Sequence, residues 1–211
     1  MNLIIPLRNG GGYEQLRFAL RSITTHHNIT DCILVGGKPA WYTGQHIPFK
    51  DYGPVHKEAN IRDKTIAGAE YCAGSFLWAN DDIILLKPYS GLHNKGLLSE
   101  CLSKRIGNGS YTRCLRNTFE HYGDVPNVDT HAVMMMDVNG VKKTAFGWPD
   151  FGIGFKTCYS QENNLQSTFY PDLKIDNPID LSNRDYFSLT DSFRNYKFLL
   201  NLYPNKCIFE L

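Results

Sequence analysis

The sequence lacks several features that would assign a protein class at once. None of its six cysteines stands in a C-x-x-C pair, so we expect free thiols in a reducing compartment, with neither a zinc site nor a disulfide framework. It has no long hydrophobic run, because the apolar stretch at residues 3–7 is too short for a signal peptide or a membrane span. These absences predict a soluble, cytoplasmic protein.

An excess of charge is also missing. Lys and Arg together number 22 against 21 Asp and Glu, which gives a formal charge of +1 at pH 7 and no global footprint for nucleic acid. No low-complexity tract interrupts the 211 residues, and 42% of them are hydrophobic, as is typical of one globular domain. The glycine-rich stretch near the start matches neither a G-x-G-x-x-G nor a Walker pattern.

Apolar runs and helical spacing alternate in the first part of the chain. Residues 2–7 and 32–35 are predicted strands covered on both faces, with a helix at 14–23 between them. A short strand at 46–49 and a helix at 56–71 follow. This order predicts an α/β fold with a mostly parallel central sheet flanked by helices. Ligands of such sheets bind beyond the carboxyl ends of the strands, where the loops Arg8-Asn9-Gly10 and Gly36-Gly37-Lys38 are expected.

The segment 76–88, FLWANDDIILLKP, places three polar residues between two apolar runs. Carboxylates that lose their water there need a partner, and a divalent cation is the expected one because hard cations take oxygen ligands. On a strand, Asn80 and Asp82 share one face while Asp81 points to the other. We therefore expect Asn80 and Asp82 to act as a D-x-D-like pair, with Asp81 bracing the turn. The alternative is an Asx-type turn whose carboxylates face water.

Two further segments carry candidate binding residues. Lys57, Asn60 and Lys64 share one face of the predicted helix at 56–71, which would present them to phosphates or else form an ordinary solvated face. His131 follows Asp129 at the start of an apolar run, where it is either a metal ligand oriented by the carboxylate or a hydrogen-bonded structural histidine.

The second half of the chain offers candidates for an acceptor site. Four basic residues lie among aromatic ones and would bind a sugar or a nucleic-acid strand, or form a solvated surface (Lys104, Arg105, Arg113 and Arg116). Asp150 stands among aromatics and glycines at 146–155, as in a sugar or base pocket or in a hairpin loop packed on the core. Residues 186–202 show helical spacing, with Asp191 inside the pattern.

Six motifs in fixed order carry a resemblance to known proteins: QLRFALRSI, CILVGGKPAW, HKEANIRDK, FLWANDDIILLKP, DTHAV and LYPNKCIFE. The chain resembles glycosyltransferase-like proteins of bacteriophages and, more distantly, the Stealth family of capsular-polysaccharide phosphotransferases. The similarity spans most of residues 3–86 and returns at 129–131 and 203–210. It implies a GT-A-like nucleotide-diphospho-sugar fold, with residues 1–88 as the nucleotide-sugar half and 89–211 as the acceptor half of a single domain. If a phage encodes the protein, we expect it in the host cytoplasm.

The resemblance also implies roles for individual residues. Asp82 takes the metal position, with Asp81 and His131 as further ligands of Mn²⁺ or Mg²⁺, and Asn80 faces the ribose of the donor. The nucleotide sugar would be held by the loops and the basic helix face already described (Arg8, Asn9, Gly10, Lys38, Lys57, Asn60, Lys64, Asn80 and Asp81). An inverting reaction needs a base to deprotonate the acceptor, for which we predict Asp150, with Asp129 and Asp191 as further candidates.

Glycosyl transfer from a nucleoside-diphosphate sugar to a hydroxyl is therefore the predicted activity. Phage-type relatives suggest hydroxymethylated or already glycosylated DNA as acceptor, and cell-envelope or protein glycans are the other expectation. The chain lacks the opening motif of the Stealth family, which disfavours sugar-phosphate transfer as the alternative. A metal-dependent nuclease would use the same acids, whereas a non-catalytic carbohydrate-binding module would need the aromatics near 146–155 and not the acid pair.

Overall fold

The computed structural model describes residues 1–11, 13–53, 56–89, 91–146 and 152–211. Its central sheet has five strands in the order β3-β2-β1-β4-β7. Their bounds are Gln45–Ile47 for β3, Asp31–Gly36 for β2, Asn2–Leu7 for β1, Ser75–Trp78 for β4 and Met134–Asp137 for β7. β1, β2, β3 and β4 run parallel, and β7 pairs with β4 in the antiparallel sense. The predicted α/β fold with a mostly parallel sheet is confirmed.

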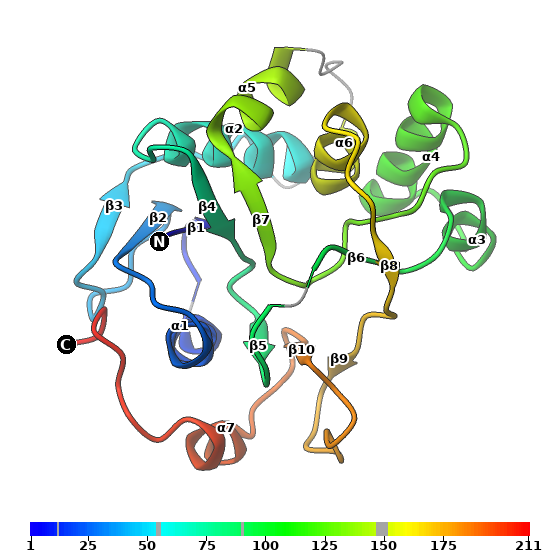
Figure 1. Cartoon of the computed structure of the whole chain (residues 1–211). Helices are drawn as coiled ribbons and strands as arrows, with labels where there is room; N and C mark the ends of the chain where they lie inside the picture. Colours follow the sequence, from blue (N-terminus) through cyan, green and yellow to red (C-terminus); the bar gives the residue numbers. More distant parts are fainter. Residues whose placement is uncertain (12, 54–55, 90, 147–151) are drawn as a thin grey trace.

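Helices cover both faces of this sheet (Figure 1). On one face lies α1 (Glu14–His26), and on the other lie α2 (Lys57–Ala69), α5 (Val138–Phe146) and α6 (Phe155–Glu162). Alternate side chains of β1 serve the two layers: Leu3 and Ile5 pack with Leu20 of α1, whereas Ile4 packs into the cluster that includes Ala69 of α2. Because β1 is buried on both faces, its sequence is almost wholly apolar, which is why it could be predicted.

The remaining elements form a second, smaller part beside the carboxyl end of β4. β5 (Ile83–Leu85) pairs antiparallel with β10 (Tyr186–Leu189), which pairs parallel with β9 (Lys174–Ile175). A two-stranded sheet joins β6 (His93–Asn94) to β8 (Thr168–Phe169). The other helices are α3 (Leu98–Ser103), α4 (Ser110–Tyr122) and α7 (Tyr196–Leu202). The two apolar runs around Asn80–Asp82 thus belong to different sheets, and the chain turns between them.

One prediction of secondary structure is wrong. Residues 186–202 do not form a single helix, because the first four of them are strand β10 and only the last seven are helix α7. All four residues of β10 are buried between β5 and β9, so apolar side chains occur at spacings that a helix would also give.

The end of the described chain is fastened to α1. The guanidinium of Arg21 makes two hydrogen bonds to Glu210, from Nε to Oε1 at 2.7 Å and from Nη2 to Oε2 at 2.8 Å. Arg17 adds a third contact at 3.3 Å, and the Glu210 side chain has no exposed surface. Such a bidentate, buried pair fixes orientation as well as contributing energy. It draws residues 203–211 along α1 toward the β2–β3 side of the sheet (Figure 1).

Candidate functional site

The order of the strands in the central sheet determines where the candidate site lies. From β1 the chain moves outward to β2 and β3, then returns to the other side of β1 for β4. Open α/β sheets bind ligands at this reversal, beyond the carboxyl ends of the two strands that flank it. The loop after β1 starts at Arg8, and the segment after β4 contains Asn80, Asp81 and Asp82. Both predicted binding segments therefore meet at the reversal point.

Glycines hold the loop after β2 against the loop after β1. A Cβ on Gly36 would lie 2.1 Å from the carbonyl oxygen of Leu7, and one on Gly37 would lie 2.7 Å from that of Arg8. Gly36 also has a φ of +114°, which side chains rarely allow. The loop after β1 is closed internally by Tyr13, whose hydroxyl accepts from the backbone N–H of Gly10 at 3.0 Å and donates to the Arg8 carbonyl at 3.1 Å. The glycines of this region thus bring the loops after β1 and β2 together at one edge.

Asn80 and Asp82 face the same side, as the period of a strand predicts, although residues 81 and 82 lie in a turn. Both meet His131: Asp82 Oδ1 lies 3.0 Å from its Nδ1, and the Asn80 side-chain amide lies 3.2 Å from the same atom. A ring nitrogen beside a carboxylate carries the proton and donates it. The Asn80 atom nearest to this ring nitrogen is Nδ2, so Asn80 and Asp82 both lie against the same side of the imidazole.

Asp82 has a partner on each oxygen. Its second oxygen, Oδ2, accepts from the Nζ of Lys174 at 3.1 Å, and its side chain is only 12% exposed. Burial alone would raise the pKa of this carboxyl, but the hydrogen bond and charge of His131 and the ammonium of Lys174 outweigh burial and hold the pKa below its usual value. Asp82 is therefore ionised at neutral pH.

The neighbouring Asp81 is different. Burial, and after it the negative charge of Asp82, raise its pKa to about 6, although Arg8 and His131 act in the opposite direction. Arg8 is exposed and its side chain has no hydrogen-bond partner among the described residues, so its guanidinium is free at the edge of the site. Two acids with different protonation behaviour thus stand side by side near one unpaired cation.

The backbone around His131 is held by hydrogen bonds to Asp172 and Lys156. Its backbone N–H donates to both oxygens of Asp172, at 3.1 and 3.2 Å. The carbonyls on either side of it, those of Thr130 and Ala132, accept from the Nζ of Lys156, which is 4% exposed. Burial lowers the pKa of Lys156 to about 8. The strand that follows begins only at Met134, so His131 lies in a loop held by these contacts and not at the start of β7.

The predicted basic helix face serves the fold. Lys64 is 3% exposed, donates to the Leu7 carbonyl at 2.6 Å and pairs with Asp51 at 2.5 Å. Asn9 donates to the same Asp51 carboxylate through its backbone N–H at 3.0 Å. Asn60 accepts from the backbone N–H of Tyr52 at 2.8 Å. Asn9, Asn60 and Lys64 therefore hold the segment around residues 49–53 against the sheet and do not present free groups to phosphates.

Three other predicted binding residues lie at the surface. Lys38 and Gly10 are exposed on the loops after β2 and β1, at the same edge as Asp82. Lys57, at the start of α2, is exposed, and its side chain has no hydrogen-bond partner among the described residues. Of the cationic residues proposed for the donor, Arg8 and Lys38 are thus placed at the sheet edge with free side chains.

The three residues predicted as the catalytic base lie in different environments. Asp129 is occupied: its carboxylate accepts from the Lys156 backbone N–H at 3.0 Å and from the Thr157 hydroxyl at 2.6 Å, so it caps the start of α6. Asp191 is exposed in the turn after β10, and its backbone carbonyl accepts from Arg194 at 2.7 Å. Asp150 lies outside the described residues.

Two residues of the site region were not predicted. Lys174, in the short strand β9, gave no sequence signal, because its contact with Asp82 joins residues 92 positions apart. Glu58, in the first turn of α2, has its pKa raised to about 7 by burial and, after burial, by the charge of Asp129. A half-buried carboxyl with a pKa near neutrality is suited to proton transfer.

The predicted metal ligands come together only in part. Both oxygens of Asp82 already have partners, and one of these is an ammonium. Within the described ranges, no group of three or more His, Cys, Asp or Glu side chains is arranged to hold a metal ion. Mn²⁺ and Mg²⁺ require several ligands in direct contact. As arranged, Asp81, Asp82 and His131 do not form a site that fits a divalent cation. The cation that the sequence predicted has therefore no ligand set among the described residues.

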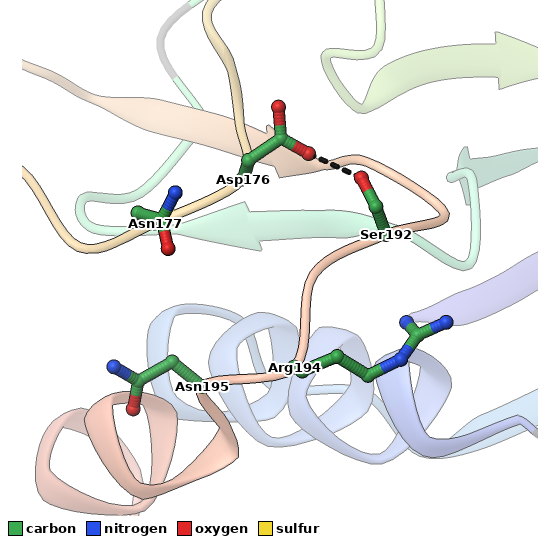
Figure 2. Close-up of a pocket in the computed structure, with 5 residues that line it drawn as sticks. All are labelled: Asp176, Asn177, Ser192, Arg194 and Asn195. Atoms are coloured by element: carbon green, nitrogen blue, oxygen red, sulfur yellow. Dashed lines mark hydrogen bonds between the residues drawn. The ribbon is translucent and has the colours of Figure 1, made fainter.

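A polar hollow lies beyond the ends of β9 and β10. It has a volume of about 690 Å³ and is lined by Asp176, Asn177, Ser192, Arg194 and Asn195. Figure 2 shows Asp176 and Ser192 pointing toward each other from two segments. Those segments continue β9 and β10, and the backbone N–H of Leu189 in β10 donates to the Asp82 carbonyl at 2.9 Å. The hollow therefore continues directly from strands that contact Asp82.

Comparison with known proteins gives little further information. No family model matches the chain, and no curated protein matches it. Among solved structures, the apo form of the glycosyltransferase GlyE of Streptococcus pneumoniae TIGR4 aligns with a TM-score of 0.38 and 10% sequence identity. The alignment covers 81% of this chain and 45% of that one, so this chain spans less than half the length of that protein. Among the described residues, no helix has the length and apolar character needed to cross a membrane.

Proposed function

We propose that the protein is a glycosyltransferase that takes a sugar from a nucleoside-diphosphate sugar to a hydroxyl acceptor. The observation that carries this proposal is the meeting of Arg8, the Asn80–Asp82 turn and His131 at the reversal point of a mostly parallel sheet. Strand order and the antiparallel β7 beside β4 are consistent with a GT-A-like fold. The resemblance of the NDD segment and the DTH loop to phage-type glycosyltransferases supports the same activity.

In this proposal the chain's own groups stabilise the leaving diphosphate. Negative charge grows on the diphosphate as the glycosidic bond breaks, and preorganised cations and N–H donors at that position lower the barrier. Arg8 and Lys174 are the cationic side chains placed for this role. The two acids of the turn have positioning roles in this proposal. Asp82 orients His131 and Lys174, and Asp81 lies close enough to Arg8 to feel its charge.

Deprotonation of the acceptor needs a base with a pKa near the working pH. Asp150 stays a prediction for this role. Glu58, whose pKa is about 7, is a described carboxyl group of suitable acidity. Asp129 is bound at the start of α6 and so is proposed to hold structure and not to accept the proton.

The acceptor is proposed from the resemblance: hydroxymethylated or already glycosylated DNA, with a cell-envelope or protein glycan as the other candidate. The basic residues that follow α3 or lie in α4 are exposed, as binding to a polyanion requires (Lys104, Arg105, Arg113 and Arg116). A DNA acceptor predicts a steep loss of binding as salt rises, because phosphate contacts release counterions. Binding that does not change with salt would favour a neutral glycan.

A thermal-shift screen tests the donor class. UDP-, GDP- and dTDP-sugars would be added singly, each with and without Mn²⁺, because a ligand that binds the native state raises apparent stability. The protein is then assayed for hydrolysis of the best donor. We expect release of a nucleoside diphosphate, and expect Asp82→Ala to abolish it. Release of a nucleoside monophosphate would indicate sugar-phosphate transfer, and tight sugar binding without any hydrolysis would indicate a binding module.

A further inference from the structure

The contact between Lys174 and Asp82 occupies the place where a metal ion is expected. Asp82 Oδ2 accepts from Lys174 Nζ at 3.1 Å, and Oδ1 lies 3.0 Å from Nδ1 of His131. A buried carboxylate needs a compensating charge, and here an ammonium of the chain supplies it. A divalent cation at Asp82 would lie beside this ammonium, and like charges repel strongly where little water screens them.

The backbone fixes both partners of this pair. Ser188 of β10 lies opposite Lys174 of β9, and the backbone N–H of Ser188 donates to the Leu173 carbonyl at 2.8 Å. The next residue of β10, Leu189, donates to the carbonyl of Asp82 at 2.9 Å. Lys174 and Asp82 are thus attached to the same strand, so the ammonium is placed by the sheet and not by a flexible loop.

Lys174 also keeps donors for a ligand. An ammonium has three N–H groups, and Asp82 uses one of them. The Lys174 side chain is 40% exposed, so its remaining donors face solvent on the same side as the 29%-exposed ring of His131. The Nε2 atom of His131 has no partner among the described residues. Arg8 adds a free guanidinium at the same edge.

We propose that Lys174 replaces the divalent cation of this site, so that Lys174 and Arg8 bind the diphosphate of the donor without metal. The diphosphate as ligand rests on the proposed function, whereas the exclusion of metal from Asp82 rests on the ion pair alone. Asp82 then acts as a positioning residue, which orients Lys174 and His131 and has no ligand contact of its own. In this proposal the turn at Asn80–Asp82 stays at the donor site, and Lys174 supplies the positive charge that a metal ion would otherwise supply to the diphosphate.

The test measures metal and anion binding separately. Free Mn²⁺ is followed by electron paramagnetic resonance as protein is added, and inorganic diphosphate binding is measured by calorimetry in EDTA. Four variants are compared with the wild type: Lys174→Met, Lys174→Arg, Asp82→Asn and Lys87→Met. The last is a matched control, because Lys87 pairs with Asp185 at 2.6 Å outside the site.

We expect the wild type to leave the Mn²⁺ signal unchanged and to bind diphosphate in EDTA. Lys174→Met should weaken diphosphate binding at least tenfold, whereas Lys174→Arg, which keeps the charge, and Lys87→Met should each stay within threefold. The proposal is overturned if the wild type binds one Mn²⁺ that Asp82→Asn removes, if diphosphate binds only with metal or not at all, or if Lys174→Met binds it like the wild type. Diphosphate binding without turnover of any nucleotide sugar would remove the proposed function, while the exclusion of metal from Asp82 and the binding of diphosphate by Lys174 would stand.

Discussion

Asp82 Oδ1 lies 3.0 Å from His131 Nδ1, and this contact joins residues 49 positions apart into one site. It connects the turn after β4 to the loop before β7, on which Lys156 and Asp172 also act. Through Lys174, the same carboxylate reaches the smaller sheet. Asp82 therefore connects the central sheet, the loop of residues 129–131 and strand β9.

Replacement of Asp82 by asparagine should separate positioning from folding. Asp82→Asn keeps the shape but removes the charge that holds Lys174 and His131, so we expect donor turnover to fall at least tenfold. The free energy of unfolding should fall by only about 1–2 kcal/mol, because Lys174 is well exposed. Asp185→Asn, in the exposed pair with Lys87, is the control and should leave turnover unchanged. Steady-state kinetics and urea titration measure both effects, and wild-type turnover in Asp82→Asn would contradict the role of Asp82.

Gly154 should tolerate no side chain. A Cβ there would lie 1.9 Å from Asp129 Oδ2, and Asp129 cannot retreat without losing Lys156 and Thr157. We expect Gly154→Ala to destabilise the protein by roughly 2–4 kcal/mol, in the range of a severe packing clash together with a lost cap. Gly109 is a matched control, since it also precedes a helix, has the same φ of −58° and has no atom within 4 Å of its added Cβ. Equal melting temperatures for the two variants would argue against the Asp129 cap.

The Arg21–Glu210 pair should matter more than a surface pair on the same helix. Glu210→Gln leaves a buried guanidinium without its counter-charge, and we expect a loss of about 3 kcal/mol. Glu14→Gln removes an exposed contact to Arg17 at 3.5 Å and should cost less than about 1 kcal/mol.

The pH dependence of the Glu210 effect follows from its pKa. Burial acts to raise that pKa, but the hydrogen bond from Arg21 lowers it below the ordinary 4.5. Its contribution to stability is therefore complete above pH 4.5 and lost as the pH falls through the lowered value. The difference between wild type and Glu210→Gln, measured by urea titration, should shrink below pH 4. A difference that stays constant down to pH 3 would contradict the ion pair.

Glu58 should give the opposite pH dependence. Burial raises its pKa from 4.5 to about 7, so the folded state holds this proton more tightly than the unfolded state. The group is neutral in both states below pH 4.5, and its cost grows as the pH rises to about 7. Glu58→Gln should therefore match the wild type in stability near pH 4.5 and exceed it at pH 8 by up to about 3 kcal/mol. A wild type that is the more stable of the two at pH 8 would contradict the raised pKa.

The elements that the sequence predicted are those whose burial is simple. β1 and β2 are covered on both faces and read as apolar runs, and α1 has one apolar face because only one side meets the sheet. The pairing of Asn80 with Asp82 followed from the period of a strand, and their meeting with His131 places two predicted segments together. The local pattern of apolar residues was sufficient to predict a strand or helix wherever the same faces of that element are buried along its whole length.

The sequence could not predict contacts that depend on tertiary placement. The basic helix face was read from spacing, yet Lys64 points inward to Asp51 and the Leu7 carbonyl, because the segment around residue 51 packs over α2. Lys174 sits in a two-residue strand whose partner is known only once β10 is placed. A charge that pairs inside the fold and a charge that binds a ligand have the same sequence signature.

The location of the donor can be measured most directly by hydrogen–deuterium exchange, with and without the nucleotide sugar that gives the largest thermal shift. We predict protection of residues 8–11 and 79–83, which form the edge beyond β1 and β4, with no change in α3 and α4 in the absence of acceptor. Protection confined to the hollow lined by Asp176 and Arg194, with residues 8–11 and 79–83 unaffected, would contradict the placement of the donor at the Asp82 cluster.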